Sequence, residues 1–257
     1  MGQLEDNCWE DKEVAARISV YRQFYQLAKD SHDNNFRKSV FDILCAHLRN
    51  MTSDPSYKEG AGKDYPTDEC QSLLNIIFDA EDFIFIEFSA NLEKAHLASA
   101  DIPRVNFTDA NFSGANLSNT DVADLCFENA NFSGANLLNV NFMSAYLRWA
   151  NFLGADLSDA GLQNANLEAA NLSHANLSQA NLDGAIMDSV NLSHANLQHA
   201  TFGDWGLENV TNVNKTDFRG ATISLEYGCR KITPKDIPDS GQYIAEWTDE
   251  KFWAKCE

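Results

Sequence analysis

The sequence predicts a mainly β fold, a four-sided solenoid that follows a small all-α domain. Two observations predict it. Between residues 91 and 207 an apolar residue returns at every fifth position, and whole segments repeat after twenty residues. Ahead of these repeats, apolar residues are spaced three and four apart, which is the period of an amphipathic helix. We therefore expect a helical domain at 1–82, the solenoid at 83–224 and a tail at 225–257.

The composition restricts the possible partners. The 257 residues carry a formal net charge of −19, which disfavours direct binding to nucleic acid or anionic membrane, because phosphates are bound by Lys and Arg. No segment approaches the roughly eighteen apolar residues of a membrane helix, and the N-terminus has no hydrophobic signal core. The six cysteines are scattered without paired spacing, so neither zinc nor disulfides are indicated. We expect a cytoplasmic protein with protein partners.

Three helices are expected in the first domain. Within 13–31 one apolar stripe is formed by Val14, Ile18, Tyr21, Phe24, Tyr25 and Leu27. Within 33–52, behind an N-cap at Asp33 or Asn34, one side is formed by Phe36, Val40, Ile43, Leu44 and Leu48. A polar loop follows at 53–66. The third helix starts near Thr67, and its residues are apolar enough that we expect it to seal one end of the solenoid.

The repeat has a five-residue unit with a central apolar anchor. The anchors fall at 92, 97 and every fifth residue to 207, and all 24 are apolar, while Ala stands two residues earlier in 18 of the 24 units. On a helix such anchors would spiral around the axis, and on a flat strand they would alternate between faces. A chain that turns a corner at every unit keeps all anchors on one axis and stacks coil on coil.

The number of sides follows from longer identities. "ANFSGANL" occurs at 110 and 130, and "NLSHANL" occurs at 171 and 191, so four units make one turn. Residues twenty apart then form columns, and one core column consists of Phe112, Phe132, Phe152, Leu172 and Leu192. Beyond 207 the anchors slip by one residue to Val213, Phe218 and Ile223, which predicts an insertion near "NVTN". The apolar tail either caps the open end or pairs two chains, so a monomer or a dimer is expected, and capping is favoured.

The stretch "ANLSHANLSQANLDGA" resembles the pentapeptide-repeat family, whose fold is a right-handed quadrilateral β-helix. The resemblance covers about half of the chain. "DILCAHLRN" and "CQSLLNIIF" are similar to helical segments ahead of such repeats in some bacterial proteins. The resemblance implies two possible roles. One is a non-enzymatic interaction scaffold, and the other is the acidic DNA mimicry by which quinolone-resistance members bind DNA gyrase, although those proteins generally lack a long helical domain.

No catalytic, cofactor-binding or metal-binding residues are predicted. The sequence has no G-x-S-x-G, no phosphate-binding glycine loop and no H-E-x-x-H. His174 and His194 share an outer column, but a third ligand at matched depth is missing. Cys126 replaces a corner Asn, and no His is stacked beside it to make it a nucleophile. We therefore expect no enzyme.

One outer column of the solenoid is acidic. It consists of Thr108, Glu128, Arg148, Glu168, Asp188 and Glu208. Three successive carboxylates at its end, without a neutralising partner in the column, either imitate the phosphates of DNA or form a solvated face. Much of the negative charge lies outside the repeats, which favours the solvated face and, with it, the scaffold.

Residues 137–157 depart from the small polar residues of their neighbours. Leu138, Met143 and Leu153 fall on three faces as a girdle. Tyr146 and Trp149 flank one face, with Ile186 in the column of Tyr146. Tyr146, Trp149, Leu153 and Ile186 are therefore the candidate protein-contact residues. The alternative is that the N-terminal helices or the C-terminal tail fold back onto them. Arg148 stands between Glu128 and Glu168, so we expect a stacked salt bridge.

Overall fold

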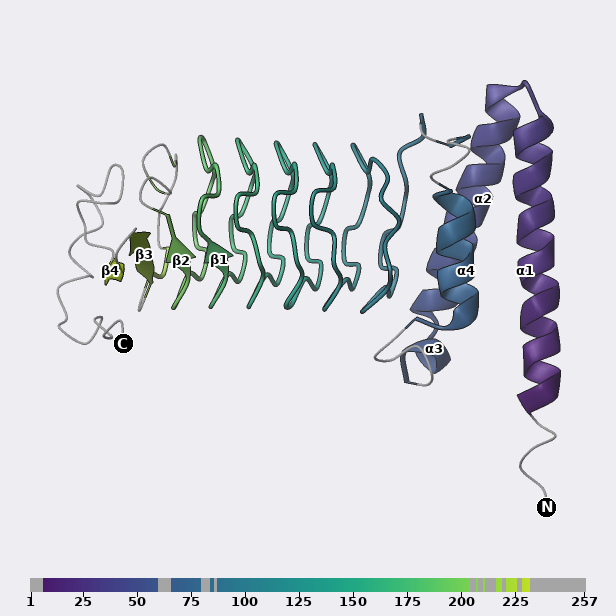
Figure 1. Ribbon diagram of the computed structural model, residues 1–257, viewed down its shortest axis with the longest axis horizontal. Coiled ribbons are helices and arrows are strands. Elements are labelled where there is room, and N and C mark those ends of the chain that lie inside the picture. The colour runs from purple at the N-terminus through teal and green to yellow at the C-terminus, as the bar shows by residue number, and fades with distance from the viewer. Residues whose placement is uncertain are drawn as a thin grey trace, which may run out of the picture.

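The computed structural model describes residues 7–59, 66–79, 84–85, 87–203, 207, 210, 216–218, 221–225 and 228–231. The chain forms a helical unit at one end of a long stack of coils, and the last described strands lie at the other end (Figure 1). The helices are α1 (Asn7–Asp30), α2 (Asn34–Ser53), α3 (Pro55–Glu59) and α4 (Asp68–Ile77). No helix in this described part is long and apolar enough to cross a membrane.

Two of the helices begin where capping residues predict. The Asp33 carboxylate accepts from the backbone N–H of Asn35 at 2.8 Å, and the Thr67 hydroxyl accepts from that of Cys70 at 3.2 Å. The short helix α3 was not predicted, since it lies in the segment that we interpreted as a polar loop. Its side chain Tyr57 packs edge-on against His96 of the first coil, which gives this turn a tertiary contact that local sequence does not reveal.

The predicted apolar stripes are partly wrong. Tyr21, Tyr25 and Ala28 of α1 are buried, whereas Phe24 and Leu27 are exposed. The same holds for α2, where Phe36 and Ile43 are exposed beside a buried core of Val40, Phe41, Leu44, Cys45 and Leu48. The reason is geometric. Positions 21, 25 and 28 share one helix face, and positions 20, 24 and 27 share a second face about 100° away, so a single list of apolar residues mixed two stripes.

The solenoid has four sides. Parallel β-bridges join residues twenty apart in four ladders, and we number the sides by the first residue of each ladder: side 1 at Asn91, side 2 at His96, side 3 at Asp101 and side 4 at Asn106. Side 3 ends in the strands β1 (Asn181–Leu182), β2 (Thr201–Phe202), β3 (Thr222–Leu225) and β4 (Gly228–Lys231). The first three strands are parallel, and β4 pairs with β3 in the antiparallel sense.

The predicted slip near the end of the repeats is confirmed. Thr201 pairs with Thr222, and Asn196 pairs with Asp217, so the spacing there is one residue longer than in the earlier coils. The tail at 225–257 was predicted to cap the rod. Its described part, β4, adds an antiparallel strand to the last ladder, and residues 232–257 lie outside the described residues.

Hydrogen bonds explain why Asn recurs in the five-residue repeat. At Asn151 the side-chain oxygen accepts from the backbone N–H of Leu153 at 3.2 Å, which closes the corner. The Asn151 amide donates to the side-chain oxygen of Asn131 in the coil before at 3.2 Å and accepts from Asn171 in the coil after at 3.1 Å. Asn151 therefore both bends its own coil and joins it to two neighbours.

The core of the rod is a stack of anchors. Phe112, Phe132 and Phe152 lie with ring centroids 5.1 and 5.0 Å apart and nearly parallel planes, and Leu172 and Leu192 continue the column. Phe78, which follows α4, packs its ring 5.0 Å from that of Phe107 in the first coil. The apolar end of α4 thus closes the core at the N-terminal end of the solenoid.

Helical side chains also take the place of a preceding coil. On side 1 the backbone N–H of Asn91 faces the Cys45 sulfur; burial raises the pKa of this thiol, and the contact with Asn91 lowers it. On side 2 the His96 N–H donates to the Thr52 hydroxyl at 3.1 Å. On side 3 the Gln71 amide makes two bonds with the Asp101 backbone, accepting from its N–H at 3.0 Å and donating to its carbonyl at 2.7 Å. Three ladders therefore end in contacts with α2 and α4.

Candidate protein-binding surface

The predicted contact residues are exposed on the rod. Tyr146, Trp149, Leu153 and Ile186 keep 54, 50, 44 and 46% of their surface accessible. Tyr146 and Ile186 lie on side 4, with Asn166 between them in the ladder, and Trp149 occupies the corner that follows Tyr146 in the same coil. Leu153 lies one corner further round. We call Tyr146, Trp149 and Ile186 the side-4 surface.

The helical unit does not cover this surface. The helices pack against the first coil, whereas Tyr146 and Trp149 belong to the third (Figure 1). About half of each of these two residues is exposed, so α1 to α4 do not bury them. The tail, which was the other proposed cover, is described only as far as residue 231, so this alternative stays open.

Trp149 has a backbone conformation that its side chain disfavours. Its φ is +58°, in the left-handed region that Gly, Asn and Asp tolerate and bulky residues avoid. The residues in the same corner of the two preceding coils are Asp109 and Asn129, with φ of +59° and +62°. A Trp at this corner costs on the order of 1 kcal/mol or more relative to those residues. The Trp149 indole is therefore present although the left-handed backbone conformation at this corner disfavours it.

Arg148 holds the indole in place. Its guanidinium carbon lies 4.3 Å from the centre of the Trp149 ring, and its Nη2 donates to Glu168 Oε1 at 3.1 Å. Its Nε is buried, and no residue in the described part of the chain accepts from it. An unpaired buried donor costs about 1–3 kcal/mol. Arg148 therefore stacks on Trp149 and pairs with Glu168 while one of its own donors stays unpaired.

The acidic column is less uniform than its sequence indicates. Glu168 is neutralised by Arg148, so the prediction that three successive carboxylates lack a partner in the column is wrong at its first member. The expected bridge from Arg148 to Glu128 on the other side is not among the ion pairs of the described residues. Asp188 follows in the next coil, and Glu208 lies outside the described residues.

The other candidate groups form no reactive site. The His174 and His194 rings are stacked 4.5 Å apart and nearly parallel. Within the described ranges, no group of three or more His, Cys, Asp or Glu residues could hold a metal ion. The Cys126 thiol contacts the Thr108 hydroxyl at 3.3 Å. These contacts join neighbouring coils and show no general base beside the thiol.

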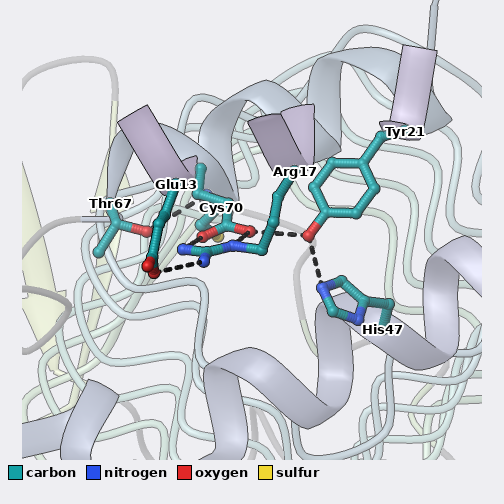
Figure 2. A network of polar contacts seen from close by, with 7 residues as sticks. Glu13, Arg17, Tyr21, His47, Thr67 and Cys70 are labelled. Carbon is teal, nitrogen blue, oxygen red and sulfur yellow. Dashed lines mark hydrogen bonds and ion pairs between the residues drawn. The ribbon is translucent and has the colours of Figure 1, made fainter. Parts of the chain in front are cut away.

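The helical unit contains a polar network that sequence reasoning did not single out (Figure 2). The Glu69 side chain on α4 is only 9% exposed. Arg17 on α1 donates to both of its carboxylate oxygens, at 2.7 and 2.8 Å, and the Tyr21 hydroxyl donates to Oε1 at 2.7 Å. Tyr21 also contacts His47 Nε2 on α2 at 2.6 Å. The network therefore ties α1, α2 and α4 together.

The charges of this network are those of a structural ion pair. Burial alone would raise the pKa of Glu69, but the hydrogen bonds from Arg17 and Tyr21 outweigh it and hold that pKa below its ordinary value. Burial, followed by the hydrogen bond to Glu69, raises the pKa of Tyr21 well above its ordinary value. Both side chains keep their usual protonation states at neutral pH, so neither is poised for proton transfer.

Comparison with known proteins gives a family and a set of solved structures. The family described as pentapeptide repeats matches in eight copies, at residues 90–123, 126–164 and 165–204. No curated protein sequence matches the chain.

Among the solved structures is the pentapeptide repeat protein Rfr23 from the cyanobacterium Cyanothece 51142, at 36% identity over 38% of this chain and 60% of that one, with a TM-score of 0.24. Another, from the Arabidopsis thaliana thylakoid lumen, is 38% identical over 37% of this chain and 62% of that one, with a TM-score of 0.23. A trypsin-treated form of the plasmid-mediated fluoroquinolone resistance protein QnrB1 is 18% identical over 52% and 87%, with a TM-score of 0.33. The chain thus spans about three fifths of the length of the first two.

Proposed function

The chain belongs to the pentapeptide-repeat family, and from this premise we propose that it is a non-enzymatic scaffold that binds a partner protein through the side-4 surface. One observation carries the proposal. Trp149 stands half exposed in a left-handed corner, and the arginine that orients it keeps a buried donor unpaired. Two local costs at one exposed aromatic residue are typical of a site kept for a contact and not for folding.

The side chains of the side-4 surface indicate what kind of partner would fit it. Trp149 and Tyr146 offer large apolar contact areas, and the Arg148–Glu168 pair lies beside them. The chain carries a net charge of −19, so a partner with basic groups around an apolar anchor approaches most readily. The free thiols of Cys45, Cys70 and Cys126 suit a reducing compartment, and we propose the cytoplasm as the location.

The test compares matched variants in one capture experiment. Trp149→Asn removes the indole and installs the residue found at position 129 of the same column. Ala169→Asn places the same new residue at the same corner one coil further on, where φ is also +58°. Quantitative mass spectrometry of proteins retained by the immobilised chain should show species that Trp149→Asn loses and Ala169→Asn retains. Identical retained sets for the three chains would refute the proposal.

A second candidate function is acidic mimicry of DNA at DNA gyrase, and the acidic column favours it. Glu128, Glu168 and Asp188 occupy three of the successive positions described in that column. Arg148 interrupts them and neutralises Glu168, which weakens the resemblance to a phosphate line. A supercoiling assay separates the two functions. A mimic inhibits or protects gyrase in a salt-dependent manner, whereas the scaffold leaves supercoiling unchanged.

A further inference from the structure

The four ladders of the solenoid do not begin alike. His96 and Asp101 each donate a backbone N–H to a helical side chain, and the Asn91 N–H faces the sulfur of Cys45. Asn106, which begins side 4, pairs with Cys126 through Phe107, whose N–H donates to the Cys126 carbonyl at 2.8 Å. On side 1 the N–H and C=O of Asn111 bond to Ala90 and Leu92 of the coil before, and the same alternation turns the N–H and C=O of Asn106 towards the helical unit. Among the described residues, neither group has a hydrogen-bond partner. Within the described ranges, side 4 therefore presents an open strand edge, whereas sides 1 to 3 end in contacts with helical side chains.

A cavity of about 330 Å³ lies beside this edge. Its wall is largely apolar and includes the aromatic side chains Tyr25, Phe78, Phe85 and Phe88 from the helical unit and the residues that follow it. Val105 and Leu125 of the rod complete this apolar lining. Asn106 and Cys126 also line the cavity, so the open edge and the apolar space form one site.

The mouth of the cavity is polar. Arg104 and Asp124 line it, their side chains are 72 and 64% exposed, and their charged groups are 3.9 Å apart. Such a pair contributes little to stability. It marks the boundary between the apolar interior and water, as the rim of a binding pocket does.

We propose that this site binds an extended segment of a partner polypeptide by β-strand addition. The segment pairs its main chain with the N–H and C=O of Asn106, and one of its side chains, aliphatic or aromatic, enters the cavity. Alternate residues of a strand point to opposite sides, so a residue beside the pairing position can fill the cavity without disturbing the main-chain bonds. A small apolar molecule would fill the cavity but leave the N–H and C=O of Asn106 unmatched.

The inference goes beyond the proposed function, because it concerns a different site. Trp149 takes no part in it, and Tyr146 lies two coils further along side 4. A partner could use either site alone. The helical unit creates this one, since it supplies much of the aromatic wall and, in the described part of the chain, gives one of the four ladder ends no partner.

The test uses peptides and the intact chain. Random peptides of about ten residues, the length of a long strand, are displayed on phage and selected on the immobilised protein. One selected peptide is synthesised with a fluorophore, and its dissociation constant is measured by anisotropy. We expect selected peptides to share an apolar residue, and we expect hydrogen exchange at the Asn106 amide to slow at least about tenfold in the complex, since an open edge becomes paired.

Matched variants assign the site. Cys126→Tyr places bulk at the cavity, in a ladder position where the next coil already carries Tyr146. Asn166→Tyr makes the same bulk change in the same column, two coils from the cavity. The first substitution should weaken binding at least about tenfold, and the second less than about twofold. Should Cys126→Tyr unfold, Ala90→Leu fills the cavity from another wall and should have the same effect.

Several outcomes would overturn the inference. Equal binding by Cys126→Tyr and Asn166→Tyr would place the peptide elsewhere. Unchanged exchange at Asn106 would exclude strand pairing, and so would binding of the dye anilinonaphthalene sulfonate in the cavity without any selected peptide. A wild-type dimer that Cys126→Tyr converts to a monomer would identify a second copy of the chain as the occupant.

Discussion

Replacing Glu69 by Gln tests how the helical unit is held together. The substitution keeps the size of a side chain that is 9% exposed and removes the charge that Arg17 contacts through two nitrogens. Breaking a buried ion pair costs about 3–5 kcal/mol when the remaining charge is trapped. The Arg17 side chain is 45% exposed and can be hydrated. We therefore expect a smaller loss of unfolding free energy, about 2–3 kcal/mol.

The pH dependence follows from the lowered pKa of Glu69. A carboxyl whose folded pKa lies below its unfolded value stabilises the fold above that unfolded value, about 4.3. The contribution is lost as the pH falls through the folded pKa. The wild-type helical unit should therefore lose stability as the pH falls below about 4.3, and Glu69→Gln should show a flatter profile there, because the titrating group is gone.

The assay is urea unfolding followed by the helical circular-dichroism signal, repeated across the acidic range. Glu13→Gln is the matched control, since Glu13 also contacts Arg17, at 3.8 Å, but is 80% exposed. It should change the unfolding free energy by less than about 0.5 kcal/mol. If Glu69→Gln and Glu13→Gln have equal effects, or if the wild-type and Glu69→Gln profiles stay parallel below pH 4.3, the assignment of Glu69 as the buried centre of the network is wrong.

Three further predictions concern the rod and are measured by thermal unfolding, where 1 kcal/mol shifts the midpoint by about 2–4 °C for a chain of this size. Trp149→Asn should leave stability within about 1 kcal/mol of the wild type, because relief at the left-handed corner offsets the lost stacking of Arg148; a loss above about 2 kcal/mol would make the indole structural. Asn151→Ala removes three hydrogen bonds and should cost about 1–3 kcal/mol, against less than about 1 kcal/mol for Asn166→Ala, whose side chain is bonded only to Glu168 N–H within the described part. Gly134→Ala and Gly184→Ala both place a methyl group at a positive φ, but only the second meets an atom, the side-chain oxygen of Asn164; equal losses would show that the contact is unimportant.

The solenoid could be predicted because its signal is repeated. An apolar anchor such as Phe132 or Leu172 recurs every five residues, and each one indicates a buried position. The identities at twenty residues indicate the number of sides. The exposure of Tyr146 and Trp149 could be predicted for the same reason, since they stand out against a regular background, whereas their role in a protein contact stays a prediction. The handedness and the domain limits stay predictions.

The helical unit has no repeated sequence against which unusual residues could be recognised. Arg17, Tyr21 and His47 resemble surface residues of amphipathic helices, and the network that joins them to Glu69 spans 26 to 52 positions of sequence. The roles of Thr52 and Gln71 at the first coil have the same origin. Polar contacts between distant segments leave no local period, so periodicity could find neither the network nor the ladder ends.

Closure of three ladder ends by Cys45, Thr52 and Gln71 gives the assembly of the rod a direction. These residues precede every coil in the chain, so they are synthesised before the residues that pair with them, and we expect them to fold first. Each new coil then adds twenty residues to an edge that already exists, and at about 5–20 residues per second one coil is completed every few seconds. A chain without α2 and α4 would have to nucleate its first coil alone, and a nucleus in the middle of the repeats would expose two growing edges instead of one. We therefore expect the helices to act as a starting surface that sets both the register and the order in which the coils form.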